Sequence, residues 1–86
     1  MKLTYDPRYN IAYLSFYEKT EQVETIRISD ELNIDMAPNG TIYGFELLNA
    51  NQQLLTEPQN QLVVINEALN DSQTISLAQV SQVSEA

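Results

Sequence analysis

Asp35 and Glu46 are the two residues whose type and spacing come closest to a chemical site in this 86-residue chain. They flank Asn39-Gly40, a dipeptide that predicts a β-hairpin, because a type I′ turn needs positive φ at two successive residues. With a two-residue loop, Gly44 faces Asp35, and Glu46 lies diagonally across from Asp35 on the same face. Diagonal cross-strand positions are about 7 to 8 Å apart. The two carboxylates could therefore share a proton or a hard cation such as Ca²⁺ or Mg²⁺.

The same pair is also explained as two hydrated side chains on the polar face of a sheet. A calcium site takes about six to eight oxygen ligands, and no loop of this sequence supplies them. Asp6 precedes Pro7, so a turn explains this third carboxylate. We therefore predict no catalytic residue, no cofactor and no metal ligand, and we keep the Asp35 and Glu46 site as an alternative.

The amino-acid composition argues against several classes of function. The chain has no Cys and no His, which removes thiol chemistry, the usual general base near neutral pH and the commonest transition-metal ligand. Its serines consequently have no base to activate them. Twelve acidic against four basic residues give a net charge of −8, which argues against nucleic-acid binding. The acidity favours a basic protein partner, or serves solubility only.

The predicted hairpin also sets a register for the elements around it. Ile34 then faces Phe45, and Leu32 faces Leu47, from the face opposite the two carboxylates. Met36 and Tyr43 continue this apolar face, and Pro38 and Thr41 close the turn. A slip of one residue would exchange the faces, so burial and turn chemistry predict the same pairing.

Short connections join the other strand candidates, which are residues 1–5, 11–17 and 22–28, with 11–17 near the middle of the sheet. Parallel strands would need crossovers of about a dozen residues, so the sheet is predicted to be antiparallel. The predicted fold class is α+β, with a four- to five-stranded curved antiparallel β-meander and a short helical C-terminal segment. We expect one domain over 1–86, with the sheet core in 1–50 and a partly helical extension in 51–86.

The extension gives a less decisive pattern. Residues 51–55 are compatible with a helical turn or an irregular continuation. Residues 61–69 have apolar spacing that favours a short helix, although Leu-Val-Val-Ile also suits a buried strand. Residues 74–83 place Leu77 and Val80 on one helical face, with Ser76 as the N-cap.

Several motifs in order resemble a prokaryotic family of small proteins, domain of unknown function 2283. They are Met1-Lys2-Leu3-Thr4-Tyr5-Asp6-Pro7, Ala12-Tyr13-Leu14, Asp35, Gly40 and Tyr43-Gly44-Phe45-Glu46-Leu47-Leu48-Asn49-Ala50. The resemblance covers about residues 1–50. The family usually has acidic residues in the loop after Tyr5-Asp6, where this chain has Arg8 and Asn10. Its members resemble companions of small toxin-like proteins in bacterial gene neighbourhoods.

Taken together, these features predict a non-enzymatic protein-interaction module. The most specific form of this prediction is an antitoxin-like protein whose acidic surface attracts a basic toxin-like partner encoded next to it. The complex would then bury Leu62, Ile65 and Leu69, or the partner would pair along an exposed strand edge. The alternative is a small-ligand or divalent-cation-binding domain. The five tyrosines suit core packing or an exposed interface. We also expect a homodimer, no membrane contact and a cytoplasmic location.

Overall fold

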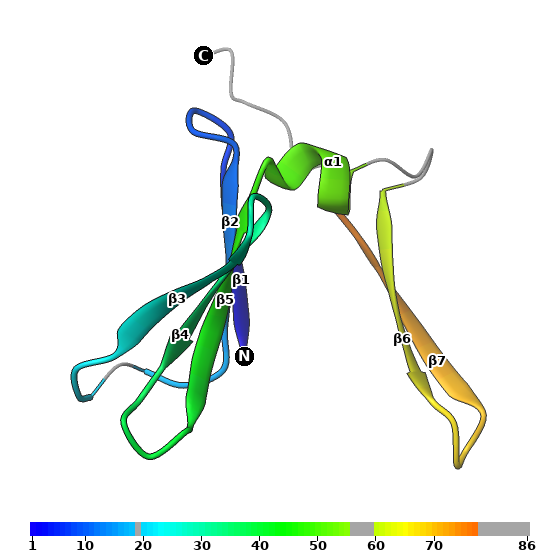
Figure 1. The fold of residues 1–86 in the computed structure, drawn as a ribbon. Helices are drawn as coiled ribbons and strands as arrows, with labels where there is room; N and C mark the ends of the chain where they lie inside the picture. Colours follow the sequence, from blue (N-terminus) through cyan, green and yellow to red (C-terminus); the bar gives the residue numbers. More distant parts are fainter. Residues whose placement is uncertain (19, 56–59, 78–86) are drawn as a thin grey trace.

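The computed structural model describes residues 1–18, 20–55 and 60–77. Its main element is a five-stranded antiparallel sheet in the order β1-β2-β5-β4-β3 (Figure 1). Its strands are β1 (Lys2–Asp6), β2 (Ile11–Ser15), β3 (Glu24–Ser29), β4 (Leu32–Met36) and β5 (Ile42–Leu48). The helix α1 (Ala50–Leu54) follows β5. A separate two-stranded hairpin consists of β6 (Gln61–Asn66) and β7 (Asp71–Ser76).

This architecture confirms the predicted α+β class, with a curved antiparallel sheet and one short helix among the described residues. β3, β4 and β5 follow one another as a meander, and β5 then pairs with β2. As predicted, β2 lies inside the sheet, between β1 and β5. The two edges of the sheet are β1 and β3.

The turn between β4 and β5 differs from the predicted type I′ hairpin. Ala37 accepts a hydrogen bond from the Gly40 N–H and donates its own N–H to the Thr41 carbonyl, each at 2.9 Å. The loop therefore has three residues, and of Asn39 and Gly40 only the glycine has positive φ, at 91°. This combination is typical of a type I turn followed by a left-handed residue.

A bulge in β5 restores the predicted register beyond this longer loop. Met36 pairs with Ile42 instead of Tyr43, so that part of the prediction is wrong. The register then shifts between Met36 and Asp35, and Asp35 pairs with Gly44 as predicted. The extra loop residue and the bulge cancel, which leaves the remaining pairs of β4 and β5 in the predicted alignment.

The predicted apolar pairs form, but they do not close a core. Ile34 pairs with Phe45 and Leu32 with Leu47, and all four side chains are half-buried. Phe45 also meets the Phe16 ring edge-on, with 5.4 Å between the centroids. Among the described residues, the buried hydrophobic ones are Ala12, Ala37, Tyr43 and Ala50. No large side chain in that set is completely buried, because the apolar face of the sheet has only partial cover.

The C-terminal extension contains its helix at α1, within the region predicted to be partly helical. The predicted helix over residues 61–69 is wrong, because 61–66 form β6. The predicted helix starting at Thr74 is also wrong up to Ser76, which ends β7. Its residues 78–83 lie outside the described part of the chain.

Three asparagines attach α1 to the sheet. The side-chain amide of Asn10 donates to the side-chain oxygens of Asn49 and Asn51, at 3.1 and 2.8 Å. The Asn10 carbonyl also accepts the Ala50 N–H at 2.9 Å. Asn10 and Asn49 both have left-handed backbone conformations, which asparagine tolerates better than most residues. The helix therefore starts at a fixed position beside the turn that joins β1 to β2.

Candidate functional site

A buried carboxylate lies on the polar face of the sheet. Asp35 is 6% exposed, and its two oxygens accept hydrogen bonds from the hydroxyls of Tyr13, at 2.8 Å, and Thr25, at 2.6 Å. These donors belong to β2 and β3, so the contacts join strands on both sides of β4 and β5. A carboxylate removed from water needs such donors, because burying it unpaired is costly.

Gly44 makes room for the tyrosine in this cluster. Gly44 is on β5, opposite Asp35 of β4 and Ser15 of β2, so the Tyr13 ring passes over it to reach β4. A Cβ at Gly44 would lie 2.6 Å from the Tyr13 hydroxyl and 2.6 Å from the Leu14 carbonyl oxygen. Both distances are too short for a carbon atom, so this site needs glycine for space.

Glu46 shares the face of Asp35 but has its own partner. Its carboxylate accepts a hydrogen bond from the side-chain amide of Asn33 at 2.8 Å. The diagonal placement of Glu46 and Asp35 agrees with the predicted pairing. Within residues 1–18, 20–55 and 60–77, no group of three or more Asp, Glu, His or Cys side chains gathers in a metal-binding arrangement. The structure thus gives the cation-binding alternative no supporting observation.

Asp6 forms the turn that was predicted for it. Its Oδ1 accepts the Arg8 N–H at 3.0 Å, two residues along the chain, as in an Asx turn. The Arg8 guanidinium donates to both Asp6 oxygens, at 3.1 and 3.0 Å. The hydrogen bond from this side chain lowers the pKa of Asp6 below its ordinary value of 3.8. The pair is exposed and holds the β1–β2 turn in shape.

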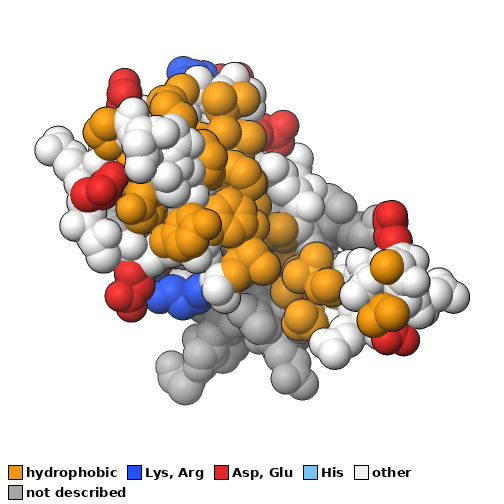
Figure 2. Space-filling view, turned by 90° about the horizontal axis from the view of Figure 1, so that it is seen from below, with side chains coloured by type: hydrophobic (Ala, Val, Ile, Leu, Met, Phe, Trp, Pro, Cys, Tyr) orange, Lys and Arg blue, Asp and Glu red, His pale blue; other side chains and the backbone are white. Residues whose placement is uncertain are grey.

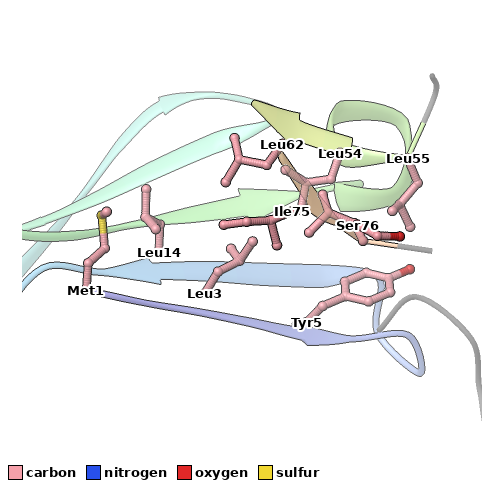
Figure 3. A pocket seen from close by; sticks show the side chains of 10 residues that line it. Met1, Leu3, Tyr5, Leu14, Leu54, Leu55, Leu62, Ile75 and Ser76 are labelled. Atoms are coloured by element: carbon pink, nitrogen blue, oxygen red, sulfur yellow. The ribbon is translucent and has the colours of Figure 1, made fainter. Parts of the chain in front are cut away.

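An apolar cleft of about 330 Å³ lies between the sheet and the hairpin β6–β7 (Figure 3). Side chains from β1, β2, α1 and both hairpin strands point into it from opposite sides. Its lining consists of Met1, Leu3, Tyr5, Leu14, Leu54, Leu55, Leu62, Ile75, Ser76 and Leu77. Such a lining suits an apolar group, whether it belongs to a small ligand or to a protein side chain.

Hydrophobic side chains also gather outside the cleft. Figure 2 shows them in a band that crosses the sheet and continues toward the hairpin, with acidic side chains around its margin. On the hairpin, Val63, Val64, Ile65 and Leu69 lie outside the cleft lining and are exposed, the most exposed being Leu69 at 68%. Contiguous exposed apolar surface of this kind marks an interaction site more often than a free surface.

The residues predicted to contact a partner fall in different places. Leu62 lines the cleft, whereas Ile65 and Leu69 are exposed elsewhere on the hairpin. Tyr43 is buried and meets the Tyr17 ring edge-on, with 5.7 Å between the centroids. Tyr5 lines the cleft. Tyr9 and Tyr17 are exposed, so the tyrosines do not form one binding surface.

Two features of the candidate site were not predicted from the sequence. Tyr13 and Thr25 were not predicted to bind Asp35, although Gly44 opposite Asp35 in the predicted register was a signal that something large crosses the sheet there. The cleft was missed because its hairpin wall was expected to be helical. Its sheet wall, with Leu3 and Tyr5 on one face of β1, was visible in the alternation of residues 1–5.

None of the described helices has the length and apolarity that a membrane crossing requires. No curated protein and no solved structure matches the chain. Residues 2–51 match the family described as protein of unknown function (DUF2283). This match spans β1 through β5 and the start of α1, including Asp35 and the residues that surround it. The chain therefore belongs to the DUF2283 family.

Proposed function

We propose that this protein is a non-enzymatic interaction module that binds a basic protein partner in the cleft between its sheet and its hairpin. The observation that carries this proposal is the cleft itself, which is lined by apolar side chains from both walls. An apolar segment of the partner fills the cleft, and basic residues beside that segment meet the acidic surface.

Charge supports a basic partner over a neutral or acidic one. The chain carries twelve acidic and four basic residues. The two arginines are already engaged locally, Arg8 with Asp6 and Arg27 with Asp30. The exposed acidic side chains at positions such as Glu18, Glu24 and Glu67 remain in excess. Opposite charges of this kind accelerate association and weaken it at high salt.

The sharpest form of the proposal is an antitoxin-like role, in which the partner is a basic toxin-like protein encoded next to this one. The test is co-expression of this protein with the product of the neighbouring gene, followed by size-exclusion chromatography at low and high salt. We expect co-elution at about 50 mM salt and weaker association at about 500 mM, because screening shortens the reach of the charges. Failure to co-elute at low salt would contradict this form of the proposal.

A pair of variants on β7 separates cleft binding from charge alone. Ile75→Asp places a charge in the cleft, whereas Gln73→Asp places the same charge two residues earlier on the same strand, outside the cleft lining. We expect Ile75→Asp to weaken the complex by at least about tenfold and Gln73→Asp to leave it nearly unchanged. Equal effects of the two variants would remove the cleft from the binding surface.

A further inference from the structure

The strand β6 has the composition of an interior strand but lies at an edge. Its sequence, Gln-Leu-Val-Val-Ile-Asn, contains no charge, no proline and no glycine, and all six residues are exposed. Apolar residues on both faces are typical of a strand whose two faces are covered by other parts of a protein. In the hairpin, β6 has one neighbour, β7, so its other edge has no strand beside it within the described residues.

The two edges of the main sheet are protected, which makes β6 an exception within the same molecule. β1 carries Lys2 and Asp6 and is followed by Pro7. β3 carries Glu24 and Arg27, and its register shifts between Arg27 and Ser29. Charges, proline and bulges are the devices that keep edge strands from pairing with other chains. β6 has none of them.

From this contrast we infer that β6 is a dimerisation strand: it pairs antiparallel with β6 of a second copy of this chain, giving a four-stranded sheet β7-β6-β6-β7 about a two-fold axis. This inference goes beyond the proposed function, because it uses the free edge of β6 and leaves the cleft for a partner. A two-stranded hairpin is only marginally stable by itself, and two more strands would correct that. The contact is self-complementary and closes after two copies, so it does not propagate into a fibre.

The composition of β6 suits a second copy, since the four apolar residues between Gln61 and Asn66 carry no charge that would repel the same strand of another copy. Centred on Val63, the two-fold axis places Val63 opposite its own copy and Leu62 opposite Val64. The two copies of Asn66 are then six strand positions apart, which is about 20 Å. Glu67 follows Asn66, so its two copies are at least this distant, beyond the screening length of about 10 Å at 0.1 M salt. Repulsion between the two Glu67 copies is therefore largely screened at the contact.

Hydrogen-bond alternation identifies which residues face the free edge. Leu77 donates its N–H to the Asn60 carbonyl at 2.6 Å, across the open end of the hairpin. Paired residues that exchange hydrogen bonds alternate with pairs that do not, so the bonds of β6 to β7 continue at residues 62 and 64. Val63 and its cross-strand partner Thr74 consequently direct their N–H and carbonyl groups outward, at opposite edges of the hairpin.

This geometry provides a matched pair of variants. Val63→Pro removes an outward N–H from the β6 edge, and Thr74→Pro removes the corresponding N–H from the β7 edge of the same residue pair. Sedimentation of the full chain measures the dimer dissociation constant. We expect the wild type to dimerise, Val63→Pro to weaken the dimer by at least about tenfold, and Thr74→Pro to change it by less than about threefold.

Amide hydrogen exchange of the wild-type chain provides a second readout that no substitution can disturb. Protection of the Val63 amide should increase with protein concentration, while that of the Thr74 amide should not. A chain that stays monomeric at about 100 μM, or a dimer whose Val63 amide exchanges freely, overturns the inference. If both proline variants are monomeric, hydrogen exchange of the wild type decides between the outcomes. Protection of the Val63 amide that rises with protein concentration supports the pairing, and the absence of such a rise overturns it. A wild type that pairs β6 only with a foreign strand also overturns it.

Discussion

The five-stranded sheet and the C-terminal hairpin use the same antiparallel pairing but treat their surfaces differently. The sheet has charged edge strands, a bulge in β3, and side-chain hydrogen bonds to Asp35 that link strands β2, β3 and β4. The hairpin exposes apolar side chains on both faces of β6. The difference shows that the edges of the sheet are protected against pairing with other chains, whereas the hairpin exposes the apolar surface that we propose another molecule covers.

Gly44→Ala should give the largest effect, and it tests how tightly the sheet is built. The new Cβ would lie 2.6 Å from the Leu14 carbonyl oxygen, so backbone must move. We expect a loss of about 3 kcal/mol in the free energy of unfolding, measured by urea denaturation. The control is Gly40→Ala, which has open space but a φ of +91° and should cost about 1 kcal/mol. A smaller loss for Gly44→Ala than for Gly40→Ala would contradict this interpretation.

Matched truncations sharpen the comparison between the two regions. Phe45→Ala removes a half-buried ring that packs on Phe16, and should cost about 2 kcal/mol. Ile65→Ala removes a hairpin side chain that is 59% exposed, and should cost less than about 0.5 kcal/mol in dilute solution. Denaturation at several protein concentrations provides the measurement. Only the Ile65→Ala effect should grow with concentration, because that side chain gains contacts on association. Equal losses of unfolding free energy for Phe45→Ala and Ile65→Ala in dilute solution would contradict the proposed difference between the sheet and the hairpin.

Tyr13→Phe is a smaller change that tests the hydrogen bond between Tyr13 and Asp35 across the sheet. It removes the hydroxyl that donates to Asp35 Oδ2 at 2.8 Å and keeps the ring above Gly44. We expect a loss of about 1 to 2 kcal/mol, because a buried carboxylate loses a donor. Replacing Asp35 by Asn in the same background should show coupling in a double-mutant cycle, since both residues belong to one network. Additive costs would show that the hydroxyl and the carboxylate act independently.

Arg8→Gln should have the smallest effect. The hydrogen bond from the Arg8 side chain lowers the pKa of Asp6, so the variant should raise that pKa toward its ordinary value. The lowered pKa stabilises the fold above the ordinary pKa, and that contribution is lost as pH falls through the lowered value. Both side chains are exposed, so solvent screens the pair and global stability should hardly change. An NMR titration of the Asp6 carboxyl in the wild type and in the variant checks the direction.

Local signals predicted the antiparallel pairing of β4 with β5, because that pairing follows from alternation and turn residues. The pairs of Asp35 with Gly44 and of Ile34 with Phe45 were correct even though the loop between them was one residue longer than predicted. The bulge that compensates for this was not predicted, because the alternation of side chains does not reveal it. The Tyr13 hydroxyl likewise reaches Asp35 only once the strand order places β2 and β4 on either side of β5.

The hairpin was mispredicted because its strands give conflicting signals. Leu62, Ile65 and Leu69 have helical spacing, and β7 contains polar residues without alternation. The informative signal was the turn: the Asn66 side-chain oxygen accepts the N–H groups of Ala68 and Leu69, at 3.1 and 3.2 Å, and Asn70 has positive φ. A solvent-exposed hairpin cannot be distinguished from a helix by burial pattern, since neither face is buried.

The asparagine contacts between Asn10, Asn49 and Asn51 have a consequence for a protein whose surface is dominated by ionisable acids. Amides do not titrate, so acidification or added salt that neutralises the exterior leaves this junction unchanged. The first turn of the helix stays anchored to the sheet while the electrostatic attraction that we propose for a basic partner rises or falls. Affinity can thus respond to the ionic medium without any change in how α1 is joined to the sheet.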